Sequence, residues 1–220
     1  MKYLLKVYPE PQKFIEAITE ENPKDGASEK KTSFSSLIKK ENLRMFLLEE
    51  QHYLCLYCQS TIDLKTSQAE HYLSQKNNPS LSLDYSNLYA SCECNELKRT
   101  KASAETSEMR NDFCGNRKGH TELVWSPVKD STAIATQNHP NPFFEVNTET
   151  GEIIGFGENE MLVNEFIRIC NLNHKILKRA RSEAYKAVTD SGLPLKEMVI
   201  RVASHPELAY NQFILNGLLV

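Results

Sequence analysis

The stretch Cys55-Leu56-Tyr57-Cys58 opens the part of the chain that decides its fold. Five of the six cysteines lie between positions 55 and 114, where Cys92, Cys94 and Cys114 follow this pair. Two thiolates separated by two residues can share one tetrahedral zinc ion, and in a reducing compartment close cysteine pairs are more often metal ligands than disulfides. The clustering predicts a small module in which a metal ion replaces part of the hydrophobic core.

Three zinc ligands follow from the spacing, and the fourth is open between two cysteines. Cys55 and Cys58 form the pair, and Cys92 is the natural third ligand. Cys94 lies only two positions further on, which is tight for two ligands of one ion. We favour Cys114, because it opens a polar turn that can lead into a helix. Four thiolates leave no open coordination position, so this zinc ion is expected to hold the fold and not to catalyse.

Between the cysteines lie three residues whose chemistry suits phosphodiester hydrolysis. Glu70 and His71 are adjacent, and Asn87 begins a strand-like run that ends at Cys92. Histidine has a pKa near neutrality and suits a base that deprotonates water, while carboxylate and amide oxygens suit Mg²⁺. Adjacent side chains of a strand point to opposite faces, so Glu70 and His71 reach one site only where the strand twists or ends. The pattern predicts a metal-dependent nuclease.

Outside the cysteine region the chain is predicted to be mostly helical, after a loop-like start. Prolines and charged residues interrupt residues 1–33. Apolar residues three and four positions apart predict a helix that begins near Ser33 and runs toward His52. A hairpin is expected over 143–155. The lone Cys170 is expected to be a buried, inert thiol. Further helices are predicted over 161–170, 176–188 and within 195–219.

These patterns divide the chain into three parts of an α+β protein that is mainly helical. An N-terminal extension covers residues 1–33, and the zinc-containing module with its leading helix covers 34–120. A connecting hairpin and a helical C-terminal region cover 121–220. Residues 91–111 are rich in Glu, Lys, Ser and Thr, and they look like an exposed insertion within the module.

Composition and charge narrow the function classes. A hydrophobic content of 40% and a charged content of 25% are ordinary for a soluble globular protein. No apolar run approaches the roughly 18 residues that span a bilayer, and no signal peptide is evident, so a cytoplasmic protein without a membrane partner is expected. The net charge of −3 argues against a generic DNA-coating protein. Basic residues between Lys98 and Lys118 are nevertheless placed for phosphate contact.

Taken together, these residues resemble the HNH endonucleases, whose ββα-metal fold is built on this pattern. More narrowly, they look like the HNH nuclease subunit of Septu and retron-associated anti-phage systems. The likeness extends outside the module to Gly151-Glu152-Ile153 and Cys170-Asn171-Leu172-Asn173, and it covers roughly residues 34–190. The motifs that carry it are Cys55-x2-Cys58, Glu70-His71, Asn87-Leu88 with Ser91-Cys92, and Cys114-x3-Lys118-Gly119.

The resemblance implies a zinc-braced ββα-metal HNH module in an endonuclease that uses Mg²⁺ or Mn²⁺. By the family pattern, His71 is the general base, Glu70 binds or positions the catalytic metal, and Asn87 orients His71. Structural zinc is bound by four cysteines, with Cys114 and not Cys94 as the fourth. The implied partners are an ABC/SMC-like ATPase subunit and, in retron systems, a reverse transcriptase with its msDNA.

The chain departs from the family pattern at the third motif residue, a histidine or asparagine on the helix. Asn116 is the first candidate for this position, His120 the second and Asn95 the third. Three functions therefore follow as expectations. The first is a DNA endonuclease of anti-phage defence, the second is an RNA (for example tRNA) nuclease with the same site, and the third is a non-catalytic zinc-braced adaptor.

Overall fold

In the computed structural model of the protein, the described residues are 6, 9–21, 27–93, 112–123 and 143–219. Helices and three two-stranded antiparallel sheets make up the fold, which agrees with the predicted α+β class. Two alternative site residues, Cys94 and Asn95, lie outside the described residues. So does most of the predicted insertion at 91–111, whose first two residues instead complete a buried strand.

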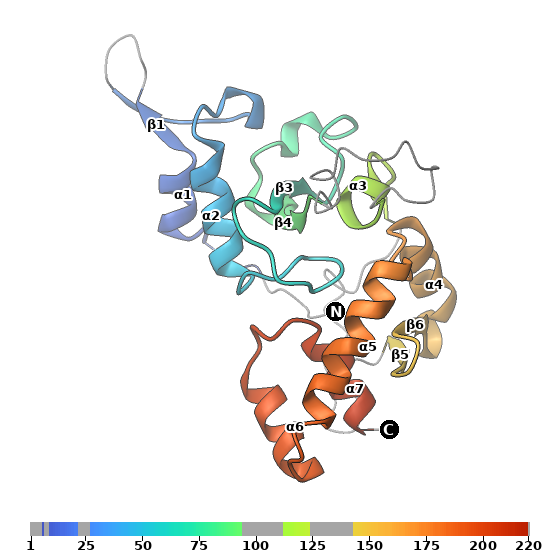
Figure 1. Ribbon diagram of the computed structural model, residues 1–220. Helices are drawn as coiled ribbons and strands as arrows, with labels where there is room; N and C mark the ends of the chain where they lie inside the picture. Colours follow the sequence, from blue (N-terminus) through green and yellow to red (C-terminus); the bar gives the residue numbers. More distant parts are fainter. Residues whose placement is uncertain (1–5, 7–8, 22–26, 94–111, 124–142, 220) are drawn as a thin grey trace, which may run out of the picture.

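The N-terminal half contains one longer helix that packs on a β-hairpin, with short helices and a second hairpin beside them. Its elements are α1 (Gln12–Ala17), β1 (Thr19–Glu21), β2 (Ser28–Lys30), η1 (Phe34–Ser36), α2 (Lys40–Glu50), β3 (Ser67–His71), η2 (Pro79–Leu81), η3 (Tyr85–Asn87), β4 (Leu88–Cys92) and α3 (Cys114–Lys118). Helix α2 packs on β3 and β4, and α3 contacts β4 from the other side (Figure 1). In the hairpin, Glu70 pairs with Tyr89 and His71 with Leu88.

The predicted loop character of residues 1–33 is wrong for α1. Phe14 is fully buried, and its ring centroid lies 5.6 Å from that of Phe46 and 5.1 Å from that of Tyr85. Aromatic contacts of this kind add to the free energy of burial. The local sequence does not reveal the helix because its apolar face is defined only by the partners it meets on α2 and η3.

The predicted start of the leading helix near Ser33 is also wrong, because α2 begins at Lys40. The reason is a carboxylate from the N-terminal extension. Glu20 accepts hydrogen bonds from the backbone N–H groups of Ile38 and Lys39, at 3.0 and 2.7 Å. These bonds hold the preceding residues out of the helix and supply acceptors for N–H groups at its start.

The C-terminal half begins with a hairpin and continues as four helices. Its elements are β5 (Phe144–Asn147), β6 (Glu152–Gly155), η5 (Gly157–Asn159), α4 (Glu160–Ile169), α5 (Lys175–Thr189), α6 (Leu195–Ser204) and α7 (Asn211–Leu219). The predicted hairpin and later helices are thereby confirmed. Gly151 has a φ of +73°, and a Cβ there would lie 1.7 Å from the Lys178 carbonyl oxygen, so the hairpin turn lies directly on α5.

One hydrophobic core joins the two halves. It extends from Phe14 through the cysteine module to Leu177 and Phe213, and α5 runs from the module toward α6 and α7 (Figure 1). A smaller cluster around Val202 and Ile214 packs α6 against α7. In the part of the chain that the structure describes, no helix has both the length and the apolar character to cross a membrane.

Candidate metal centre and hydrolytic site

Four buried cysteines converge at the base of the β3–β4 hairpin. The sulfur atoms of Cys55, Cys58, Cys92 and Cys114 all lie within 4.8 Å of one another. The Cys92 sulfur is 3.7 Å from that of Cys55 and 3.9 Å from that of Cys58. A tetrahedral zinc site with zinc–sulfur bonds of about 2.3 Å has sulfur–sulfur edges of about 3.8 Å. The spacing therefore fits one zinc ion, and it is far too long for disulfides.

The choice of Cys114 as the fourth cysteine agrees with this geometry. Cys114 is the first residue of α3, and its backbone N–H donates to the Cys170 carbonyl at 2.8 Å. Hydrogen bonds from Cys114, Cys55 and Cys92 hold the pKa of Cys58 well below the usual thiol value, which favours the thiolate that a metal binds. Burial raises the pKa of Cys170, as expected for an inert thiol.

A buried glutamine at the end of α2, to which the sequence assigned no structural role, holds the first cysteine pair near the hairpin. The amide nitrogen of Gln51 donates to the carbonyls of Leu54 and Ala90, at 2.9 and 2.8 Å. Its amide oxygen accepts from the Ala90 N–H at 2.7 Å. Gln51 thus joins the end of α2 to the middle of β4. A glutamine after an apolar helix carries no local signal of this role.

His71 is held in one tautomer by a backbone carbonyl. Its Nε2 lies 2.9 Å from the Ser82 carbonyl oxygen, and that oxygen can only accept a hydrogen bond. The proton of the neutral ring is therefore on Nε2, and the lone pair is on Nδ1. The ring of Phe34 packs edge-on against the imidazole, with centroids 5.1 Å apart. Burial lowers the pKa of His71, which favours the neutral ring that a base requires.

Asn87 fixes the loop that carries this carbonyl. Its side-chain oxygen accepts from the Leu73 N–H at 2.7 Å, and its side-chain nitrogen donates to the carbonyls of Leu73 and Leu81, each at 3.1 Å. Leu81 is the residue before Ser82. The predicted orientation of His71 by Asn87 would therefore be indirect. Asn87 holds the backbone of the loop, and the loop carries the Ser82 carbonyl that His71 contacts.

Glu70 points to the opposite face of β3 and does not join His71. Its carboxylate accepts from the Tyr57 hydroxyl at 2.8 Å and from the Lys118 ammonium at 2.9 Å. Lys118 also donates to the His71 carbonyl at 3.1 Å. A Cβ on Gly115 would lie 2.4 Å from the other Glu70 oxygen, so only glycine lets α3 approach this closely. Glu70 is thus paired with the ammonium group of Lys118, the last residue of α3.

The predicted phosphate contact by Lys118 is wrong, because its side chain is 1% exposed. Arg117 is exposed and pairs with Asp112 at 2.9 Å. The other basic residues of that group, from Lys98 to Arg110, lie outside the described residues. Lys118 therefore neutralises the buried Glu70 carboxylate. This role depends on the burial of Glu70, which the local sequence does not show.

The three candidates for the last motif residue have different places. Asn116 is exposed and accepts from the Gln68 amide at 3.1 Å, and Gln68 shares the Glu70 face of β3. His120 meets the loop after His71 through its Nδ1, which lies 2.9 Å from the Ser74 hydroxyl oxygen. Asn95 lies outside the described residues. Neither Asn116 nor His120 contacts His71 directly within the described part of the chain.

A second metal site is not assembled in the described residues. There, the four cysteines form the only group of three or more Cys, His, Asp or Glu side chains close enough to share an ion. Comparisons with models of known protein families and with curated proteins give no match. The HNH resemblance therefore rests on the motifs quoted from the sequence. The geometry of His71 is the main structural support for a proposed role as a general base.

Proposed function

We propose that this chain is a metal-dependent HNH endonuclease that hydrolyses phosphodiester bonds of DNA in anti-phage defence. The observation that carries the proposal is the arrangement of His71, whose Nε2 is bound to the Ser82 carbonyl so that Nδ1 keeps its lone pair. A water molecule at Nδ1 would lose a proton to the ring as its oxygen bonds to phosphorus. The bond from phosphorus to the leaving sugar oxygen would break, and that oxygen would take a proton from solvent water. The hydrogen bond to Ser82 then stabilises the imidazolium that forms, as a fixed acceptor does in other general-base sites.

The remaining parts of the proposal follow from the resemblance. A Mg²⁺ or Mn²⁺ ion would need donors beyond the described residues, and substrate phosphates commonly supply several of them. An ABC/SMC-like ATPase would be the partner, with a reverse transcriptase and msDNA in a retron system. A cytoplasmic location suits four free thiols, since a reducing compartment keeps them available for zinc. The net charge of −3 suits a nuclease whose partner supplies much of the DNA affinity.

The test is cleavage of supercoiled plasmid DNA by the zinc-loaded full chain with Mg²⁺ or Mn²⁺, with and without the ATPase. The wild type is compared with His71→Ala. The matched control is His205→Ala, because His205 is exposed after α6 and far along the chain from the module. We expect wild type and His205→Ala to nick the plasmid and His71→Ala to lose at least about 100-fold in rate. Equal cleavage by His71→Ala would refute the base assignment.

Two alternatives are separated when tRNA is added to this test as a second substrate. Cleavage of RNA, for example tRNA, but not of plasmid would favour the RNA nuclease. The non-catalytic adaptor has a specific observation in its favour, because Glu70, the predicted metal ligand, is engaged by Lys118. The adaptor hypothesis predicts that neither nucleic acid is cleaved. It also predicts that His71→Ala binds the ATPase as tightly as the wild type does.

A further inference from the structure

Arg181, in the second turn of α5, is a buried cation in the middle of the molecule. Arg181 is only 3% exposed. One terminal nitrogen donates to the Gly151 carbonyl at 2.6 Å, and the other donates to the Leu172 carbonyl. The guanidinium carbon lies 6.0 Å from the centre of the Phe213 ring. These contacts hold the guanidinium firmly, and its hydrogen-bonded partners among the described residues are neutral.

A buried guanidinium normally requires an anion. Removing a charge from water costs several kcal/mol unless an opposite charge compensates it. Among the described residues, no carboxylate lies within ion-pair distance of Arg181, and the nearby Glu152 is 4.0 Å from Lys178 instead. Burial lowers the pKa of Arg181 to about 10, which expresses this cost. Among the described residues, compensating charge reaches Arg181 from groups beyond ion-pair distance, first from Cys58 and then from Tyr210, Cys114 and Glu152.

The four-cysteine centre supplies such a charge. Arg181 and Cys58 line the same cavity of about 30 Å³, together with Tyr57, Gln59 and Tyr210. The thiolates of Cys58 and Cys114 act on Arg181 in the direction that stabilises its charge. A Zn²⁺ ion with four thiolates carries a net charge of about −2, so the loaded centre remains an anion. Positive charge and negative charge thus face each other across the boundary between the two halves.

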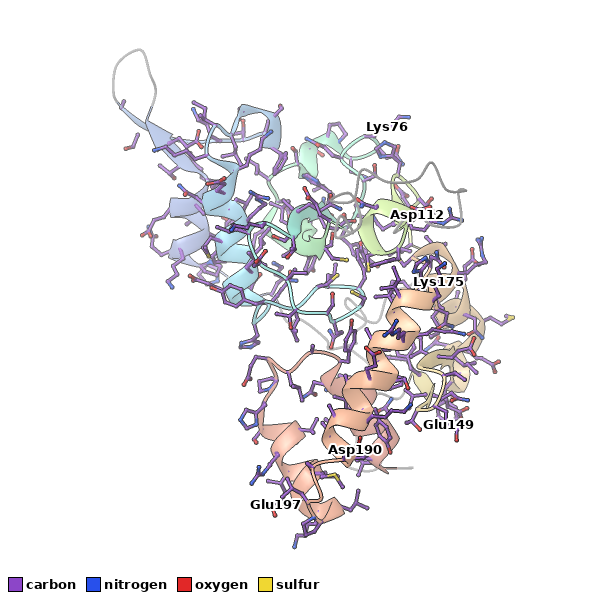
Figure 2. The ribbon with its side chains drawn as sticks, in the orientation of Figure 1. Lys76, Asp112, Glu149, Lys175, Asp190 and Glu197 are labelled. Atoms are coloured by element: carbon purple, nitrogen blue, oxygen red, sulfur yellow. The ribbon has the colours of Figure 1, made fainter. Side chains whose placement is uncertain are left out.

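Backbone hydrogen bonds also join the two halves at this boundary. The Cys114 N–H donates to the Cys170 carbonyl at 2.8 Å, and the Tyr210 N–H donates to the Gln59 carbonyl at 3.0 Å. Near the start of α5, the Asn171 side chain donates to the Asp112 carbonyl at 2.9 Å, and Figure 2 labels Asp112 just before α3 and Lys175 at the first residue of α5. Cys114 is thereby tied to the end of α4, and Gln59, the residue after Cys58, is tied to the start of α7.

We infer that Arg181 is the counter-charge of the four-cysteine zinc centre and couples zinc binding to the docking of α5. Zinc then stabilises more than its own module, because the anion it forms with the thiolates offsets the cost of burying Arg181. In return, Arg181 raises the affinity of the cysteines for zinc, as reciprocity of coupled equilibria requires. The inference does not depend on nuclease activity.

The first measurement is zinc affinity by chelator competition on the full chain. Arg181→Met removes the charge and keeps much of the side-chain length. Arg179→Met is the matched control, since Arg179 is an exposed residue of the same helix paired with Glu183. We expect Arg181→Met to lose about 10-fold or more in zinc affinity, in the range seen when groups supporting a metal ligand are removed, and Arg179→Met to match wild type. Equal zinc affinity in the two variants would overturn the inference.

Arg181→Lys separates charge from packing. It keeps the positive charge but cannot donate to both carbonyls in the fixed fork of arginine. A counter-charge role predicts that Arg181→Lys recovers most of the zinc affinity that Arg181→Met loses. Equal losses in Arg181→Lys and Arg181→Met would show that packing alone is responsible.

Hydrogen exchange of the wild-type protein covers the case in which Arg181→Met does not fold. We expect removal of zinc by a chelator to increase amide exchange along α5 at least several-fold, as well as exchange within the cysteine module. Exchange in α6 is expected to rise less than exchange in α5, because α6 packs mainly on α7 and meets only the later part of α5, from Ala184 to Val188. Unchanged exchange in α5 after zinc removal would contradict the coupling.

Discussion

The two faces of strand β3 differ in what they allow their side chains to do. On one face, His71 is half-buried, and its Nε2 bonds to the Ser82 carbonyl, while its Nδ1 has no hydrogen-bond partner among the described residues. On the other face, Glu70 is buried and bound by Tyr57 and Lys118. Adjacent residues of one motif thus have separate surroundings. The Glu70 face thus holds α3 in place, while the His71 face leaves one ring nitrogen without a hydrogen-bond partner in the described part of the chain.

Removal of one of the four clustered cysteines is expected to have the largest effect, because a metal ion held there would support both faces of β3. Cys58→Ala should release zinc and abolish the folding transition of the module, since metal binding in such modules contributes on the order of 10 kcal/mol. Thermal unfolding followed by circular dichroism, with zinc content measured in parallel, tests this. The control is Cys170→Ala, a buried cysteine outside the cluster, which should keep its zinc. A zinc-free Cys58→Ala protein with the wild-type Tm would refute the expectation.

The Glu70 face is tested by Glu70→Gln. This change leaves the Lys118 ammonium buried without a counter-charge, and we expect a loss of about 3–5 kcal/mol in the free energy of unfolding. Urea denaturation measures it, with His71→Ala as the comparison on the other face, where the loss should be much smaller. Should Glu70→Gln keep wild-type stability but lose Mn²⁺ binding, Glu70 would be a metal ligand and the comparison of the two faces would fail.

The loop behind His71 is tested by Asn87→Ala. The variant loses three hydrogen bonds, worth about 1 kcal/mol each, so the free energy of unfolding should fall by about 3 kcal/mol. The nitrogen chemical shifts of the His71 ring should also change from those of a single Nε2–H tautomer to an average. A matched control is Asn77→Ala, an exposed residue of the same loop. Unchanged ring shifts in Asn87→Ala would show that the loop does not orient His71.

The smallest expected effect concerns the burial of His71 by Phe34. Because burial holds the pKa of His71 below 6.5, the unfolded chain binds more protons between the two values. Stability from this group is therefore present above pH 6.5 and is lost as pH falls through the folded pKa. Phe34→Ala should raise the pKa of His71 and weaken this pH dependence, measured by imidazole NMR titration and by urea unfolding at pH 5 and 7. A still lower pKa in Phe34→Ala would contradict the role of burial.

The metal cluster is the part of the site that the sequence predicted best. Spacing alone selected Cys55, Cys58 and Cys92, and the preference for Cys114 over its neighbour agrees with the structure. Short-range patterns suffice there because zinc imposes one geometry on any thiolates that reach it. The helices α4 and α5 were also predictable, since their apolar residues recur at helical spacing.

The surroundings of the site were not predictable from local patterns. Gln51, Ser82 and Arg181 act through partners far along the chain, and Ser82 acts through a carbonyl that every residue possesses. The late start of α2 depends on Glu20, which lies about twenty residues earlier. No periodicity or spacing marks such contacts before the chain has folded.

By itself, the sequence predicted the clustered cysteines, the hairpin and helices of the C-terminal half, and the presence of a histidine and an asparagine suited to hydrolysis. Only the tertiary structure decided which face each residue of Glu70-His71 occupies, that Lys118 neutralises the first, and that a backbone carbonyl sets the tautomer of the second. The physical reason is that ligand spacing and helix periodicity are local properties of the chain. Burial and charge compensation depend on all the groups that folding brings together.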